Sequence, residues 1–252
     1  MKKDYRPLTL QEIDLLEYEL LSVMLGGFDE ITFKTWEWLK TTEAGEAFYE
    51  QSIRLAEFFN NSGINDTWNT IIEERARTGV NVTEMIYDYA RQVNMEDHLI
   101  PYTDTEIRAL NRLCDYNYEM IRNVTQDEVM AIRRQLVQDF ANGTHPTYTS
   151  LKELQLQPIN GFSPEKRAEM IARTETARTL NISTLETYRN DGVEMVTLYG
   201  CNTDCEICGE YFSPTPIDEA LEVGVPHPNC HGAWVSAENA PPVPEPGMPW
   251  EI

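Results

Sequence analysis

The chain has 252 residues, a formal net charge of −22 and 41% hydrophobic residues. This length predicts one or two domains with a true hydrophobic core, and the composition excludes a globally disordered chain. The excess of acidic residues argues against a broad surface for nucleic acid or anionic membrane, because such surfaces need clustered cations. No apolar run is long enough to span a bilayer, and the first residues lack the apolar stretch of a signal peptide, so we expect a protein that begins in a cytoplasm.

The first 190 residues show the hydrophobic spacing of a helical bundle. Thr9 and Glu12 form a capping box, and apolar residues follow at helical spacing, so a helix is expected to begin here. Gly26–Gly27 is expected to end it, because glycine favours helix ends over helix interiors. Helical signals resume over residues 32–59, with an interruption near 41–42.

The middle of the chain is expected to form several separate helices. Asp66 is a candidate cap for a short helix ending at Gly79, and Thr83 for another through Tyr89. Capping patterns predict further helix starts at Thr103 with Glu106 and at Thr125 with Glu128, and the second of these helices is expected to end at Gly143. A short helix is expected from Ser150 to Gln157. Ser163 before Pro164 predicts the start of a last helix, which runs to about Tyr188.

The last of these helices contains charged residues at helical spacing. Glu169 with Arg173, and Glu175 with Arg178, are spaced for ion pairs along an exposed face, which is the interpretation that we favour. The alternative is that Arg173 and Glu175 are partly buried and connect this helix to its neighbours.

The composition changes near Asp191. From this residue to the end the chain has eleven acidic residues and no lysine or arginine, which indicates a domain boundary. The side chains of residues 193–199 alternate in the way that is typical of a strand. Residues 240–250 are rich in proline and are expected to form an extended tail.

Four clustered cysteines and one histidine carry the sharpest chemical signal. Cys205 and Cys208 form a C-x-x-C pair, and His227 and Cys230 form an H-x-x-C pair after eighteen intervening residues. Two short-spaced pairs of thiolate and imidazole donors are typical of a tetrahedral zinc site. With four protein ligands such a site is closed, so we expect a structural role for the metal.

The ligand set and the presence of a metal both stay open at this point. Cys201 and His231 are spare donors, and either can replace one of the four. The alternative to a zinc site is a set of free or oxidised cysteines without metal. No H-E-x-x-H helix and no deaminase pattern is present, so we expect no catalytic residues in this cluster.

Two motifs and their order resemble a known family. Ile171–Thr176 reads Ile-Ala-Arg-Thr-Glu-Thr, and the predicted strand, the C-x-x-C pair and the motif His227-Pro228-Asn229-Cys230 follow. This succession resembles the phage Mu F-like head morphogenesis proteins, also called minor head or minor capsid proteins, over roughly residues 100–235. The resemblance implies a structural protein that is present in few copies in the phage head, associates with the portal vertex and acts in head assembly or genome delivery.

Two departures from the family pattern concern the metal ligands. The family motif often continues with Arg and Cys, where this chain has His231 and Gly232, and glycine has no side chain to offer. The family also tends to have an acid four residues before the C-x-x-C pair, where this chain has Cys201. A ligand can therefore have moved from the end of the motif to Cys201.

Taken together, these patterns predict a mainly α protein: an N-terminal and central helical bundle, a small zinc-stapled α+β module, and an extended Pro-rich tail. The expected parts are an unassigned helical region at 1–100, the helical part of the Mu F-like domain at 101–190, a strand and Cys/His zinc module at 191–236, and the tail at 237–252. The expected function is that of a non-enzymatic minor head protein of a tailed bacteriophage, located in the virion and in the host cytoplasm during assembly. Its expected partners are the portal protein, the major capsid protein or both, and it has no expected contact with a membrane.

Two other functions stay open. One is an effector enzyme carried in the phage head, such as an ADP-ribosyltransferase, and the other is a zinc adaptor protein of the host cell. A contact with DNA would have to come from arginines of the helical part, which we interpret as a solvated helix face: Arg108, Arg112, Arg122, Arg133 and Arg134.

Overall fold

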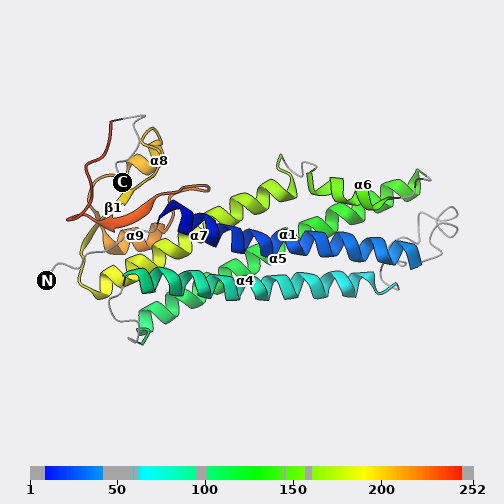
Figure 1. The fold of residues 1–252 in the computed structure, drawn as a ribbon, viewed down its shortest axis with the longest axis horizontal. Helices are drawn as coiled ribbons and strands as arrows, with labels where there is room; N and C mark the ends of the chain where they lie inside the picture. The colour runs from blue at the N-terminus through cyan, green and yellow to red at the C-terminus, as the bar shows by residue number, and fades with distance from the viewer. Residues whose placement is uncertain are drawn as a thin grey trace. The chain divides into compact units, whose positions relative to one another are not determined.

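The computed structural model describes residues 9–41, 59, 62–94, 101–142, 144, 146–156 and 161–245. These residues are mainly helical, with a small three-stranded antiparallel sheet near the C-terminal end, which confirms the predicted fold class (Figure 1). The helices are α1 (Leu10–Thr41), α4 (Ile64–Asn94), α5 (Asp104–Ala141), α6 (Tyr148–Glu153), the 3-10 turn η2 (Leu154–Leu156), α7 (Pro164–Asn190), α8 (Glu206–Gly209) and α9 (Ile217–Val223). The strands are β1 (Met195–Tyr199), β2 (Thr215–Pro216) and β3 (Ala233–Ser236). Within the described ranges, no helix combines the length and the apolar character needed to cross a membrane.

Several predicted helix boundaries are wrong, because the helices continue through them, and Asp66 and Thr83, which were expected to be caps, both lie inside α4. α1 continues through Gly26–Gly27, and α4 runs from Ile64 through Gly79 to Asn94 as one helix. α5 likewise passes through Thr125, where a new start was expected.

Close packing explains the glycines inside these helices. A Cβ atom added at Gly79 would lie 2.0 Å from Cδ1 of Ile121, so no larger residue fits without movement. A Cβ atom at Gly27 would lie 3.0 Å from Cγ of Arg75, whose side chain covers this part of α1. The glycines therefore admit a neighbouring side chain to the helix surface instead of ending the helix.

Other predicted helix starts are confirmed. Glu106 accepts the backbone N–H of Thr103 at 2.7 Å, and Thr103 Oγ1 accepts the backbone N–H of Glu106 at 3.3 Å, which is a complete capping box. The predicted box at the start of α1 has the same two bonds. α7 begins at Pro164, and Ser163 Oγ accepts the backbone N–H of Lys166 at 3.3 Å. The short helix expected from residue 150 begins two residues earlier, behind the N-cap Thr147.

The second Thr-x-x-Glu pattern on α5 has a different role. Thr125 Oγ1 donates to the carbonyl oxygen of Ile121 at 2.8 Å, a bond within the helix. Glu128 is fully buried, and neither of its carboxylate oxygens has a hydrogen-bond partner among the described residues. This pair of residues is part of the helix interior and caps nothing.

Some sequence predictions fall outside the described residues. The predicted helix over residues 32–59 continues as α1 to Thr41, and residues 42–58 are not described. α5 ends at Ala141, and Gly143 is not described. Residues 240–245 form no regular element, as expected of the tail, whose remaining residues 246–252 lie outside the described part.

The chain divides into two compact units. The first comprises Met1–Leu20, Val80–Asn117 and Met170–Ile252, and the second comprises Leu21–Gly79 and Tyr118–Glu169. Each unit is assembled from segments that are distant in sequence.

The second unit has an aromatic and aliphatic core between α1, α4, α5 and α6. Trp68 is buried in this core, and its Nε1–H donates to Thr35 Oγ1 at 3.0 Å. Its fully buried members are Ile31, Phe59, Ile64, Trp68, Ile71, Ile132, Leu136 and Leu151.

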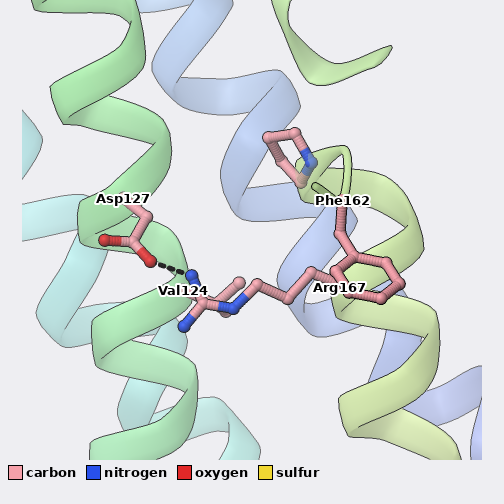
Figure 2. Close-up of a pocket in the computed structure, with 5 residues that line it drawn as sticks. Val124, Asp127, Phe162 and Arg167 are labelled. Atoms are coloured by element: carbon pink, nitrogen blue, oxygen red, sulfur yellow. Dashed lines mark hydrogen bonds and ion pairs between the residues drawn. The ribbon is translucent and has the colours of Figure 1, made fainter. Parts of the chain in front are cut away.

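A small hollow lies on the surface of the second unit. Figure 2 shows Asp127 of α5 and Arg167 of α7 joined as an ion pair, with the ring of Phe162 beside the arginine. The space between these side chains is about 10 Å³, which is room for one water molecule at most. The hollow is therefore too small for an organic substrate.

The first unit contains the sheet and a second core. β1 is the central strand, and it pairs antiparallel with β2 and β3, with Val196 opposite Thr215 on one side and Ser236 on the other. Its buried side chains pack with those of α7 and α9, and three cysteines belong to the same core. The buried members are Ala177, Leu185, Tyr188, Val196, Leu198, Cys201, Cys208, Ile217, Ala220, Val225, Cys230 and Trp234.

Candidate metal centre

Two short segments bring the predicted ligands together. Cys205 is the N-cap residue of α8, and Cys208 lies in its single turn, so one helical turn separates the two sulfurs. His227 and Cys230 lie on the loop between α9 and β3. Both segments border the core of the first unit, where Cys208 and Cys230 are buried.

The donor atoms are close enough to share one ion. His227 Nε2 lies 3.3 Å from Cys205 Sγ and 3.1 Å from Cys208 Sγ, and these three donor atoms all lie within 4.8 Å of one another. Cys230 Sγ lies 3.6 Å from Cys208 Sγ. Metal bonds of about 2.3 Å to sulfur and about 2.0 Å to nitrogen give tetrahedral edges of roughly 3.5 Å between sulfur and nitrogen and roughly 3.8 Å between sulfurs. The cluster of Cys205, Cys208 and His227 can therefore hold a metal ion.

The tautomer of His227 suits a metal ligand. Its Nδ1 lies 2.7 Å from the carbonyl oxygen of Pro228, which can only accept a hydrogen bond, so Nδ1 carries the proton. The neutral ring then presents the lone pair of Nε2 to the two sulfurs. The same contact with Pro228 is the main reason why the pKa of His227 is raised.

Hydrogen bonds to the sulfur of Cys230 favour its thiolate form. The Cys201 thiol donates to it, and this contact is the main cause that lowers the pKa of Cys230 to about 6. The backbone N–H of Gly232 also donates to Cys230 Sγ, at 3.3 Å. The pKa of Cys201 is raised in turn, chiefly by its hydrogen bond to Cys230.

The C-x-x-C turn favours a second thiolate. The backbone N–H of Cys208 is the main cause that lowers the pKa of Cys205. Burial raises the pKa of Cys208, so the thiol of this residue needs a cation beside it to ionise.

The remaining spare donor lies apart from the group of three. His231 is exposed and does not belong to that group. It lies near Glu17 of α1. Burial raises the pKa of Glu17, and the electrostatic interactions with Arg173 and His231 partly oppose this increase.

The structure changes the interpretation of the charged residues on α7. Glu175 forms the predicted ion pair with Arg178 at 3.0 Å, but it is buried, with 3% of its surface exposed, so the favoured exposed face is wrong here. Burial raises the pKa of Glu175. Arg173 contacts Glu17 of α1 at 3.5 Å, as the alternative expects, whereas the ion pair of Glu175 stays within α7.

Two residues of α7 that hold the ligand loop were not predicted from the sequence. The backbone N–H of Asn229 donates to Thr174 Oγ1 at 3.1 Å. Asn181 Nδ2 donates to the carbonyl oxygens of Gly224 at 3.2 Å and Gly232 at 3.0 Å. Their only signal in the sequence is a spacing of seven residues, which places Thr174 and Asn181 on one face of a helix.

We compared the chain with protein-family models, with curated proteins and with solved structures, and none of the three comparisons gave a match.

Proposed function

We propose that this chain is a non-enzymatic minor head protein of a tailed bacteriophage, and that a structural zinc ion holds its C-terminal module together. The observation that carries this proposal is the bond between Asn229 and Thr174 at 3.1 Å. It joins the Ile-Ala-Arg-Thr-Glu-Thr helix to the His-Pro-Asn-Cys turn, and these are the two motifs on which the resemblance to Mu F-like head proteins rests. Because these two motifs follow each other in the family's order and also contact each other, we expect them to form one structural unit.

The donor chemistry supports zinc as the metal. Thiolates and a neutral imidazole are the ligands that zinc prefers, and three distances among the four donors, 3.3, 3.1 and 3.6 Å, are close to tetrahedral edge lengths. We assign Cys230 as the fourth ligand, beside Cys205, Cys208 and His227. Cys201 then acts as a hydrogen-bond donor to the Cys230 sulfur, and His231 stays outside the set. Four protein ligands leave no open position for a substrate, so the metal is structural.

The charge distribution supports a protein partner over DNA. The segment from Asp191 onward has no lysine or arginine, and Arg122 of α5 is engaged with Glu73 at 3.1 Å. We propose that the protein binds the portal or the inner capsid surface during head assembly, and that it is found in the virion.

The test is purification of the tagged full chain from phage-infected cells, with metal analysis of the same fraction. We expect the portal or capsid subunits to accompany it, together with about one zinc per chain. As a matched control, Cys114→Ser changes a buried cysteine of α5 that lies outside the cluster and should leave both results unchanged. A chain that arrives alone contradicts the minor head role, and a chain without metal contradicts the zinc site.

A further inference from the structure

The turn that carries His227 and Cys230 has an unusual backbone. Asn229 has φ 63°, in the left-handed region that asparagine tolerates better than most residues. Pro228 and Asn229 are exposed, so the turn has little apolar cover at this end. A turn of this kind keeps one conformation only if its surroundings hold it.

Thr174 of α7 holds the exposed end of the turn. Its hydroxyl donates to the carbonyl oxygen of Met170 at 2.7 Å and accepts the N–H of Asn229 at 3.1 Å. The hydroxyl proton and one lone pair are both committed, so its orientation is determined. Thr174 itself is 6% exposed, which strengthens the bond by excluding water.

Asn181 of α7 holds the other end. It donates to the carbonyl oxygen of Gly232, and its Oδ1 accepts the backbone N–H of Trp234 at 3.3 Å. Its second N–H reaches the carbonyl oxygen of Gly224, at the end of α9. The amide of Asn181 thus contacts the chain on both sides of the ligand turn.

We propose that Thr174 and Asn181 are positioning residues for the metal centre. The two residues lie two helical turns apart on α7. Their side chains hold residues 227–232 so that His227 and Cys230 face the C-x-x-C pair. This inference rests on the proposed metal site, because it concerns how that site is formed. Groups that orient ligands in this way are typically worth about 10-fold to 100-fold in metal affinity.

The test compares Thr174→Val with Thr174→Ser in the full chain, loaded with cobalt(II) or zinc(II). Valine has the shape of threonine but cannot accept the N–H of Asn229, whereas serine keeps the hydroxyl. We expect zinc affinity, measured by competition with a chromogenic chelator, to fall about 10-fold to 100-fold in Thr174→Val and to recover in Thr174→Ser. The visible cobalt bands, which report tetrahedral geometry, should weaken in the valine variant alone.

A matched control lies on the same helix. Thr187 is also buried and donates to the carbonyl oxygen four residues back, at 3.0 Å, so Thr187→Val makes the same change away from the ligand turn. It should leave the affinity and the cobalt spectrum at wild-type values. If Thr174→Val folds poorly, Thr174→Ala removes the same hydroxyl with a residue that favours helices.

The outcomes separate the two proposals. Wild-type affinity and spectrum in Thr174→Val and Thr174→Ala would overturn the positioning role while leaving the metal site in place. A wild-type chain that binds neither cobalt nor zinc would overturn the metal site, and the positioning role with it.

Discussion

Cys201 and Cys230 show how two neighbouring residues of the same type take different roles. Each is buried, and each is in hydrogen-bond contact with the other. The contact lowers the pKa of Cys230 and raises that of Cys201, because one thiol donates and the other accepts. Cys230 also shares a short motif with His227, whereas Cys201 precedes α8 on a separate loop. This difference supports our proposal that Cys230 is a ligand and that Cys201 donates a hydrogen bond to its sulfur.

The buried carboxyl group of Glu128 is expected to make the stability of the protein depend on pH. Burial, with a smaller contribution from Asp29, raises its pKa to about 8 in the folded chain, against 4.5 for an ordinary glutamate. Between these two pH values the folded state keeps a proton that the unfolded chain has lost, so the free energy of unfolding falls as the pH rises. The total loss is on the order of a few kcal/mol, since each pH unit contributes at most about 1.4 kcal/mol. It is complete above the folded pKa.

Glu128→Gln removes this titration and keeps the size of the side chain. We expect the variant to be more stable than the wild type by a few kcal/mol at pH 8, with the difference shrinking towards zero near pH 4.5. Denaturant unfolding at pH 5, 6.5 and 8 measures it, with the exposed Glu153→Gln as a control in the same unit. A stability difference that does not change with pH would show that Glu128 is already ionised in the folded chain.

At the scale of the helices, replacing a glycine by alanine is expected to have opposite effects on stability in α4 and in α1. Gly79→Ala places a methyl group 2.0 Å from Cδ1 of Ile121, and overpacking of this kind costs about 1–3 kcal/mol of unfolding free energy. Gly26→Ala meets only the end of the flexible Arg75 side chain, at 3.2 Å, so the better helix propensity of alanine should leave the protein equal or more stable. Thermal or denaturant unfolding of both variants distinguishes them.

A double variant tests the cause of the Gly79 effect. Ile121→Val removes the atom that the new methyl group would strike, and in the wild type it should cost about 0.5–1.5 kcal/mol. In the Gly79→Ala background we expect it to cost less or to restore stability. Additive effects of the two changes would contradict the contact between them.

Capping patterns predicted some of the helices correctly and others wrongly, for a physical reason. Thr103 with Glu106 and Thr125 with Glu128 are the same four-residue pattern. The first follows Pro101, which cannot continue a helix, and it caps α5. The second follows a stretch without proline or glycine, so the helix continues into it and the threonine bonds within the preceding turn. A local pattern alone cannot separate these cases.

The site was predictable where its chemistry lies in short spacings. The C-x-x-C pair and the histidine of the H-x-x-C pair were predicted as ligands, and the donor atoms of Cys205, Cys208 and His227 lie within 4.8 Å of one another, whereas Cys230 is outside this group of three. Thr174 and Asn181 could not be identified, since they bond to backbone groups of a loop about fifty residues away. Only the fold determines which backbone groups meet a helix face.

At the scale of the whole molecule, the metal is expected to decide whether the C-terminal module folds while the helices form without it. The module after Gly192 has short strands, and three of its buried core residues are cysteines, so we expect it to rely on metal binding, which can supply on the order of 10 kcal/mol. Cys230→Ser, or removal of the metal with a chelator, should therefore expose residues 193–236 to proteolysis and leave most of the helical circular dichroism intact. Cys201→Ser is the matched control, because serine still donates a hydrogen bond to Cys230, and it should keep the metal and resist proteolysis. If Cys201→Ser behaves like Cys230→Ser, then Cys201 is itself a ligand, and if neither variant is cleaved, the module folds without a metal.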